Sequence, residues 1–562
     1  MCCLIVAAAL LLGSPATAAA SGPPAATPPA GIIHLLTDDW GWGDAEPFGS
    51  AKPLPGTGFA APIEMNGKPV GAAAHAVSTV RTPHLLQMAH EGLVLSSFYS
   101  ASPVCGPSRQ AWLSGRFPAD RGINFHDNPS GVLEDKYRGI AQFLDPRTTP
   151  TVYSVLNQSG WDVSMFGKWS IGGGKVAGLD DFRDPSCRDD PETDKNWIPH
   201  PGFYGVHNHR TFSGNDEFDD PCTPTLLEGC AHPENWPNCT YWFSEASGLI
   251  ANYTLAAASK ATSELHKRFY IQASFHAVHE SQAPSPAQIE RYGVGCGGIN
   301  KEVESGQESC ARQVYITAQR DTDFQIGRIL DWARSFESSP AANGSTVLAI
   351  FSSDNGPEAR EVYMDAVGYT GPFRGRKRSL YDGGIRMPTI VRWPGVVLPN
   401  RVDESSLGAV DWLPTVVALT GAKHLLTPSQ WEAIDGVDMS PILLAREQRT
   451  RVNRTRPLFW EWRGQIAGPC WNQSPQLAVR EDRWKLLMDP SSADGDGREE
   501  LYDLWSFREP GAAPPEYVNM RSEQPEVAAR LRELLLEWKG SLDPENTTWT
   551  VPKPGCAAYP FP

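Results

Sequence analysis

Three features are scarce in this sequence: long apolar runs, basic charge and repeats. Beyond the first twenty residues no stretch approaches the roughly 18 continuous apolar residues of a membrane-spanning helix, so we expect no membrane span. Lys and Arg number 49 against 65 Asp and Glu, a net charge of −16. Because non-specific nucleic-acid binders carry a basic footprint, this balance argues against a nucleic acid as partner. No internal repeat is apparent, which argues against a repeat array.

The composition is that of a chain that buries a core, with 41% hydrophobic and 20% charged residues. Its 562 residues allow two to four domains, or one large α/β core with a smaller unit. Residues 1–20 hold an apolar stretch followed by small residues, which indicates a signal peptide even though its start lacks Lys and Arg. The alternative is a buried N-terminal segment. A Pro/Ala-rich linker follows at 21–30.

Export through a signal peptide would bring the chain into an oxidising compartment. Sequons of the N-x-S/T type agree with export, although each one alone is a weak signal. They lie at Asn157, Asn238, Asn252, Asn343, Asn453, Asn472 and Asn546. Asn472 is the poorest acceptor of the set, because a proline follows its serine. The chain has 11 cysteines, an odd number, of which Cys2 and Cys3 fall in the signal peptide.

The pattern of apolar runs predicts an α/β fold. The segments 31–39 and 346–356 each read as a buried strand that ends in acidic or amide residues. Helical patterns lie between them, for example at 82–95 and 149–161. Alternation of strands and helices over some 400 residues predicts a large, mainly parallel sheet flanked by helices. Ligands bind such sheets beyond the carboxyl ends of the strands, where both acidic pairs fall.

Two regions differ from this alternation. Residues 180–260 are rich in Pro and Asp, and we interpret them as a long insertion pinned by disulfides, which is a common place for specificity. From about residue 455, short strand-like runs separated by turn residues predict a smaller antiparallel sheet. The run 523–540 has apolar residues at helical spacing and predicts an amphipathic helix.

The segment 103–122 carries the most chemistry. Pro107 and Ser108 mark the start of a helix whose N-terminus lies close to Cys105. The helix dipole and the charge of Arg109 would stabilise an anionic oxygen or sulfur on residue 105. The alternative from spacing alone is a structural half-cystine before a helix.

This segment resembles the signature of the type I sulfatases, in which C-x-P-S-R is followed by L-[TS]-G-R. Here it reads Cys-Gly-Pro-Ser-Arg, then Leu-Ser-Gly-Arg at 113–116. Further segments match in order: LLTDDWGWGD, FGKWSIG, SFHAVHE, FSSDNGPE and the lysine motif FRGRKRSLYDGG. The resemblance covers residues 31 to at least 505. It implies an alkaline-phosphatase-like fold, with a catalytic domain at 31–454 and a C-terminal domain at 455–562.

The resemblance also implies a modified nucleophile and a metal. In this family the cysteine, here Cys105, is oxidised to formylglycine (3-oxoalanine) by a formylglycine-generating enzyme during secretion. The metal ligands would be Asp38, Asp39, Asp354 and Asn355, with an oxygen of modified Cys105 completing the sphere. Such hard oxygen donors suit Ca²⁺, with Mg²⁺ as the alternative, rather than zinc. One hydroxyl of the aldehyde hydrate would attack sulfur, and the second would allow sulfate to leave.

The remaining site residues follow from the same motifs. Lys168 and Lys377 match the lysines that bind sulfate, and Arg109 would help activate the nucleophile. His276 matches the histidine near the leaving group, where it would act as general acid; His279 is close in sequence, and we rank it second. The implied substrate is a sulfated glycan or small molecule, and the implied location is secreted or lysosome-like. The cysteines left to pair are Cys187, Cys222, Cys230, Cys239, Cys296, Cys310, Cys470 and Cys556.

One position departs from the family. The usual motif is G-K-W-H-x-G, and this chain has Ser170 in place of the histidine. A serine hydroxyl hydrogen-bonds but is no base near neutral pH. His200, His207 or His209 is a candidate replacement. The alternatives to a sulfatase are a phosphomonoester or phosphonate hydrolase on the same fold, and, because of Ser170, a catalytically impaired protein that binds sulfated glycans. Substrate specificity would come from the 180–260 segment, where aromatic residues could stack on sugar rings, although buried aromatics are the commoner case: Trp197, Trp236, Tyr241, Trp242 and Phe243.

Overall fold

The computed structural model of the chain describes residues 28–49, 64–65, 68–69, 81–121, 144, 146–171, 201–212, 242–279, 288, 291, 308–358, 368–447, 449–450, 452, 454–462, 472–489, 498–505 and 515–542. The signal peptide and most of the linker lie outside these residues. So do the side chains of the eight cysteines that we expect to pair, and those of the aromatic residues in the 180–260 segment that we named as candidates for sugar binding.

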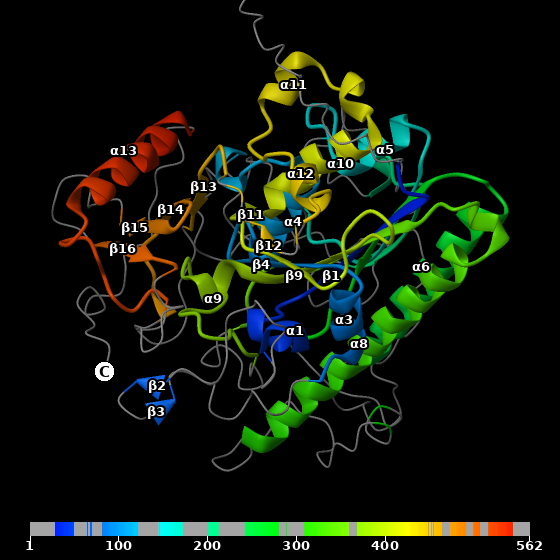
Figure 1. Ribbon diagram of the computed structural model, residues 1–562, viewed down its shortest axis with the longest axis horizontal. Coiled ribbons are helices and arrows are strands. Elements are labelled where there is room, and N and C mark those ends of the chain that lie inside the picture. Colours follow the sequence, from blue (N-terminus) through cyan, green and yellow to red (C-terminus); the bar gives the residue numbers. More distant parts are fainter. Residues whose placement is uncertain are drawn as a thin grey trace, which may run out of the picture.

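The described part of the chain is built on a ten-stranded sheet (Figure 1). Its order is β12-β10-β4-β9-β8-β1-β7-β5-β6, with β11 beside β4. The strands are β1 Gly31–Thr37, β4 Leu93–Tyr99, β5 Asp162–Lys168, β6 Asn208–Phe212, β7 Phe269–Ser274, β8 Val347–Ser353, β9 Arg386–Arg392, β10 Arg401–Asp403, β11 Leu407–Gly408 and β12 Arg449–Thr450. All pairs are parallel except those of β9, which runs antiparallel to both β4 and β8. The mainly parallel sheet is confirmed.

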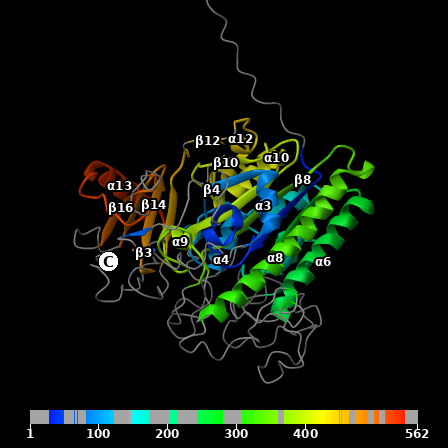
Figure 2. The ribbon, with the colours of Figure 1, turned by 60° about the horizontal axis from the view of Figure 1, so that its bottom comes forward.

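Helices cover both faces of this sheet. Along β1 every residue is buried, and successive side chains point to opposite faces. Ile33 and Leu35 join one apolar cluster with α3 (Pro83–His90), α6 (Trp242–Ser263) and α8 (Glu308–Glu337). Ile32 and Leu36 join another with α4 (Cys105–Ser114), α5 (Val152–Gln158) and α10 (Trp412–Thr420). Figure 2 shows α6 and α8 side by side along one face. The sheet is therefore the middle layer of three.

The described residues also form shorter elements. They are α1 Glu46–Gly49, the β2–β3 pair (Glu64–Met65 and Lys68–Pro69), α9 Asp382–Ile385, α11 Pro428–Glu432 and α12 Ser440–Leu443. Short 3-10 turns lie at Trp42–Asp44, Pro118–Arg121, Pro201–Tyr204, Pro340–Ala342, Ala409–Asp411 and Ala422–Leu425.

A second, antiparallel sheet follows, as the sequence predicts. Its strands are β13 Leu458–Glu461, β14 Leu477–Glu481, β15 Trp484–Met488 and β16 Glu499–Asp503, in that order. The expected amphipathic helix is α13 Pro525–Ser541, whose Leu531 and Leu535 pack against the sheet. Asp482 and Arg483 turn the chain between β14 and β15, and Asp482 takes the left-handed conformation that tight turns need.

Two expectations from the sequence are wrong. The helical pattern at 82–95 covers two elements, because the helix ends at His90 and Leu93–Tyr99 is a buried strand. Its continuous apolar run suits a strand covered on both faces, which helical spacing does not distinguish. The segment 180–260 is not wholly an insertion. Its described parts include β6, an edge strand of the main sheet, and most of α6.

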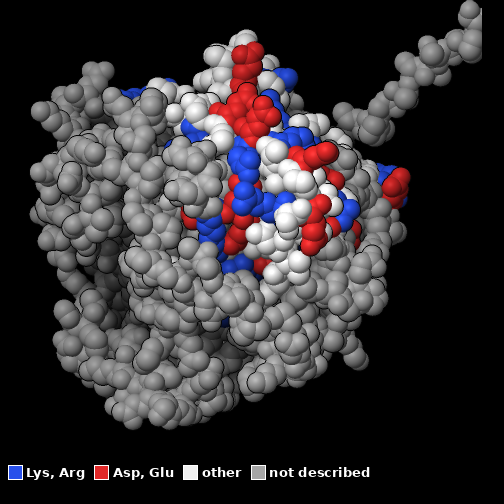
Figure 3. All heavy atoms as spheres, turned by 90° about the vertical axis from the view of Figure 1, so that its left-hand side faces the viewer, with Lys and Arg blue, Asp and Glu red and all other residues white. Residues whose placement is uncertain are grey.

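No described helix has the length and apolar character needed to span a membrane. On the face formed by the antiparallel sheet and α13, basic and acidic side chains are interspersed over the described surface (Figure 3). Ion pairs such as Arg530–Glu481 and Arg532–Glu499 lie there.

Candidate active site

The predicted site residues converge at one edge of the main sheet. Four neighbouring strands, in the order β8-β1-β7-β5, end there. Asp354 and Asn355 follow β8, Asp38 and Asp39 follow β1, and Lys168 is the last residue of β5. The loop after β7 contributes His276 and His279, and the site is closed by Cys105 and Lys377. Each of these side chains is buried. Parallel strands present their carboxyl ends together, which explains why motifs so distant in sequence meet.

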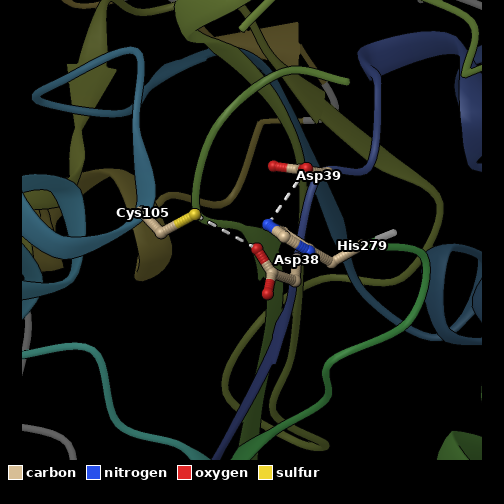
Figure 4. Close-up of side chains that lie close together, drawn as sticks. All are labelled: Asp38, Asp39, Cys105 and His279. Carbon is tan, nitrogen blue, oxygen red and sulfur yellow. Dashed lines mark hydrogen bonds and ion pairs between the residues drawn. The ribbon is translucent and has the colours of Figure 1, made fainter. Parts of the chain in front are cut away.

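Cys105 is the first residue of α4, as expected (Figure 4). Its Sγ lies 3.4 Å from Asp38 Oδ1 and 3.7 Å from Lys168 Nζ. Burial and the Asp38 carboxylate raise the pKa of the thiol well above its ordinary value, against the opposing pull of Lys168 and Lys377. The expectation that the helix and Arg109 would stabilise an anionic oxygen or sulfur on residue 105 stays a prediction. A thiol that stays protonated is a poor nucleophile.

Arg109 serves the carboxylates rather than the thiol. Its guanidinium lies 2.7 Å from Asp354 Oδ2 and donates to Ser274 Oγ at 2.6 Å and to the carbonyl of Lys168 at 2.9 Å. This side chain is buried and ties together the ends of β8, β7 and β5. It fixes the positions of Asp354 and Lys168 relative to each other.

Three carboxylates face three cations in this cluster. Beside the Arg109–Asp354 pair, Lys168 Nζ lies 2.5 Å from Asp38 Oδ2, and Lys377 Nζ lies 2.8 Å from Asp39 Oδ2. Burial acts to raise the pKa of Asp38, but Lys168, His279 and Arg109 hold it well below its usual value. Burial and Asp38 raise the pKa of Asp354 despite Arg109. Of Asp38 and Asp354, Asp38 is thus the carboxylate held more firmly in its charged form.

The donors of this cluster fit a divalent cation. One ligand atom each from Asp38, Asp39, Cys105 and His279 lies within 4.8 Å of the others. Asn355 Nδ2 donates to Asp39 Oδ1 at 2.6 Å, and its amide oxygen is buried with no hydrogen-bond donor among the described residues. A buried amide oxygen that accepts no hydrogen bond is expected to have another partner, and a cation fits that role. With the carboxylates it makes a hard oxygen set, which suits Ca²⁺ or Mg²⁺.

The two histidines are placed differently. His279 Nε2 lies 3.8 Å from Asp39 Oδ2, inside the cluster (Figure 4). His276 is its neighbour, with ring centroids 5.0 Å apart. Burial and Lys168 lower the pKa of His276 to about 3, and burial with both lysines lowers the pKa of His279 well below its usual value. Sequence reasoning ranked His279 second. The backbone N–H of His279 donates to the carbonyl of His276, and this turn places the His279 side chain in the cluster.

One site residue was not singled out from the sequence. Glu358 ends the motif FSSDNGPE, and its Oε2 lies 3.7 Å from Lys377 Nζ and contacts Arg378. Lys377 is therefore held between the carboxylates of Asp39 and Glu358. The sequence signal was present in the motif, but an acidic residue in a loop is usually a solvated one, whereas this side chain is buried.

Neither candidate histidine in the described part of the 180–260 segment takes the place of the usual family histidine at position 170. His207 accepts a hydrogen bond from Val163 N, near the start of β5, whereas Lys168 is at the opposite end of that strand. His209 pairs with Met165 in mid-strand, and His200 lies outside the described residues. Ser170 itself has a left-handed backbone, with φ +43°, and its hydroxyl is buried with no hydrogen-bond partner in the described structure.

Comparison with known proteins decides the family. A family model described as Sulfatase matches residues 31–422, a range that contains every site residue above. The chain belongs to the sulfatase family. It is similar to the N-acetylgalactosamine-6-sulfatase of Homo sapiens, with 27% identity over 74% of this chain and 66% of that protein. It is also similar to the steryl-sulfatase of Rattus norvegicus (25% identity, 79% and 80%) and to human arylsulfatase A (28%, 75% and 69%).

Solved structures agree on the fold. One is Ps i-CgsB in complex with k-i-k-neocarrahexaose, with a TM-score of 0.62 and 17% identity over 94% of this chain and 96% of that one. Another is a protein solved with its substrate D-glucosamine-2-N,6-O-disulfate, with a TM-score of 0.57 and 15% identity over 93% and 100%. At these identities the likeness concerns the fold, and it extends over both sheets of this sulfatase.

Proposed function

We propose that this chain hydrolyses sulfate monoesters of a carbohydrate, with residue 105 as the nucleophile after its conversion to formylglycine. The observation that carries the proposal is the placement of Cys105 at the N-terminus of α4, between Asp38 and Lys168. Burial and the Asp38 carboxylate raise the pKa of the Cys105 thiol and so disfavour the thiolate, which makes the position better suited to an oxygen nucleophile than to a sulfur one.

The site would hold a divalent cation in addition to its own side chains. When bound, a divalent cation, Ca²⁺ or Mg²⁺, would polarise the sulfate and the hydroxyl of the formylglycine hydrate. Asp38, Asp39 and Asn355 are the ligands best placed for it, with Asp354, whose Oδ2 is shared with Arg109, and an oxygen of the modified residue 105.

The side chains of the chain itself would do the rest. Lys168 and Lys377 would neutralise the charge on the transferring sulfate, which stabilises it where charge develops. Lys377 and a histidine would face the leaving oxygen. His276 is the histidine expected from the sequence, but the position of His279 in the cluster favours His279 as the proton donor. Burial and the nearby lysines lower the pKa of both rings, and the negative charge of a bound sulfate would favour protonation of either one.

A carbohydrate is the substrate class we favour. N-acetylgalactosamine-6-sulfatase is among the relatives, and structures of similar fold contain a neocarrahexaose and a disulfated glucosamine. Other relatives are named for aryl and steryl sulfates, so aryl sulfates are reasonable reporter substrates. With this function we propose export to a secreted or lysosome-like location and maturation by a formylglycine-generating enzyme.

Ser170 favours one competing function, a sulfated-glycan-binding protein with slow or absent turnover, since a serine takes the place of the usual histidine beside Lys168. A panel of sulfated sugars, aryl sulfates and aryl phosphates, assayed for released sulfate or phosphate, separates the alternatives. We expect sulfate release that the Cys105→Ala variant lacks. Faster release of phosphate would support the phosphatase alternative. Binding of a sulfated glycan with no sulfate released on long incubation with Ca²⁺ would support the binding protein.

A further inference from the structure

The antiparallel sheet holds the segment that carries Lys377. The backbone N–H of Arg376 donates to Asn472 Oδ1 at 2.7 Å, and the backbone N–H of Leu380 donates to Ser474 Oγ at 2.8 Å. These bonds lie on either side of Lys377 in the chain. Both acceptors belong to the turn that leads into β14 (Leu477–Glu481), and Ser474 N closes this turn on the carbonyl of Asn472.

The segment needs partners from outside. Gly375 and Arg378 have φ values of +81° and +67°, so the backbone around Lys377 follows neither helix nor strand. Asn472 is 0% exposed and Ser474 is 2% exposed, so water does not replace them as acceptors. A buried backbone N–H that loses its acceptor is left without a hydrogen bond at a cost in stability. The turn at 472–474 therefore determines where the segment lies.

A buried charge network strengthens the same attachment. Lys485 Nζ, on β15, donates to the carbonyl of Leu380 at 2.7 Å and to Asp382 Oδ1 at 2.8 Å. The backbone N–H of Asp382 donates to Glu516 Oε2 at 2.6 Å, and Glu516 also pairs with Lys485. The C-terminal part of the chain thus holds Arg376, Leu380 and Asp382 by their backbone atoms.

The other contacts of the segment lead into the active site. Lys377 N donates to the carbonyl of Pro357 at 2.9 Å, in the loop that carries Asp354. Arg378 N donates to the carbonyl of Pro103 at 3.0 Å, two residues before Cys105. A shift of this segment would therefore move Lys377 relative to both the nucleophile and the metal ligands.

We propose that Asn472 and Ser474 are positioning residues that fix Lys377 against the leaving oxygen of the substrate. This inference rests on the proposed function. It gives the N-x-S sequence at 472–474 a role other than glycosylation, since the side chains of Asn472 and Ser474 are both buried and accept hydrogen bonds from the Lys377 segment.

The test compares two aryl sulfates whose phenols differ in acidity. The ammonium group of Lys377 would stabilise the negative charge that develops on the leaving oxygen. This stabilisation matters most when the leaving phenol is the weaker acid. We expect Asn472→Ala and Ser474→Ala to lower kcat about tenfold on the weaker phenol, equivalent to about 1.4 kcal/mol, and far less on the stronger one. Ser474→Thr keeps the hydroxyl and should restore the wild-type ratio of the two kcat values.

Asn519→Ala is the matched control. Asn519 Oδ1 also accepts a backbone N–H, that of Leu501 at 3.0 Å, and it lies in the same part of the chain. We expect this variant to leave the ratio of the two kcat values unchanged. Equal losses of kcat on both esters in the Asn472 and Ser474 variants would overturn the positioning role, and so would an equal change of ratio in the Asn519 variant.

Hydrogen exchange separates this inference from the proposed function. Amides of residues 373–385 should exchange faster in Asn472→Ala and Ser474→Ala than in the wild type, and at the wild-type rate in Asn519→Ala. If the wild type releases no sulfate, the proposed function fails and the exchange rates alone decide whether the turn holds the segment. Unchanged exchange in both variants would then overturn the attachment itself.

Discussion

At the scale of single residues, the site depends on buried charges that neutralise one another. Lys168 and Lys377 each pair with an aspartate that we propose as a metal ligand, at 2.5 and 2.8 Å. Both lysine side chains are almost wholly buried, so their charges act in a medium of low dielectric, where they are worth more than in water. The same arrangement would hold a cation and a sulfate at one place.

Replacement of either lysine should therefore damage catalysis more than folding. We expect Lys168→Ala and Lys377→Ala each to lower kcat/KM on an aryl sulfate by about 10²–10³-fold, the usual loss when a group that stabilises the transition state is removed. Lys423→Ala, at an exposed lysine over Trp431, is the control and should retain wild-type activity. Melting curves check that each variant folds. A loss below threefold in both site variants would contradict the assigned roles.

The histidines offer a second test at this scale. Because His279 lies in the cluster and His276 is its neighbour, we expect His279→Ala to reduce kcat by about 10²-fold or more, within the range for removal of a general acid, and His276→Ala to cost less. The loss in His279→Ala should be largest for sulfates with poor leaving groups. The reverse ranking of the two variants would restore His276 as the proton donor.

At the scale of elements, long-range contacts complete what local sequence begins. Thr82 stands at the N-cap of α3, but its side chain makes no capping bond. Asp323, on α8, takes that role and accepts the backbone N–H groups of His84 and Leu85 at 3.1 and 3.0 Å. Burial raises the pKa of Asp323 to about 7, although these two bonds act to lower it.

This raised pKa predicts a pH-dependent stability. The unfolded chain loses the Asp323 proton above its ordinary pKa of 3.8, whereas the folded protein keeps it until about pH 7. The contribution of Asp323 is therefore complete below about pH 4 and falls as pH rises towards 7, by at most about 1.4 kcal/mol per unit. Asp323→Asn removes the titration. Denaturant unfolding of both proteins at several pH values should show that the free energy of unfolding of the wild type rises relative to that of the variant as pH falls. A constant difference would contradict the assignment.

Some elements and side-chain positions could be predicted from the sequence, and others could not. The motifs identified the strand ends, the start of α4 and the antiparallel sheet, because each has a local signal in residue type and spacing. The strand at Leu93–Tyr99 was missed because a continuous apolar run fits a helix or a buried strand equally well. The positions of Glu358 and His279, and the contact of Asn472 with the Lys377 segment, depend on turns and on pairings across the fold. The motifs contain Glu358 and His279, but no local pattern shows where these side chains lie in the fold.

At the scale of the whole molecule, one chain joins a three-layer core to a smaller sheet that supports its active site. The acidic net charge of −16 coexists with a local group of cations, Arg109, Lys168 and Lys377, because these are buried beside carboxylates at the strand ends. Charge at the site is thus set by the fold rather than by composition.

A bound cation should also stabilise the whole fold. Since the carboxylates of the proposed metal site lie at the ends of central strands, we expect chelation to lower both the melting temperature and the rate of sulfate release. Added Ca²⁺ should restore both, and about 100 times its dissociation constant should stabilise the fold by about 2.7 kcal/mol. Asp38→Ala should lose this response. A melting temperature of the wild type that is indifferent to Ca²⁺ and to chelation would argue against a resident metal.

The central claim is that residue 105 works as formylglycine. Mass spectrometry of the peptide containing residue 105, from protein made in a secretory host that has a formylglycine-generating enzyme, tests it most directly. The account predicts the mass of the aldehyde or its hydrate at that position, together with sulfate release that rises with the converted fraction. Only unmodified cysteine, in protein that still releases sulfate, would contradict it.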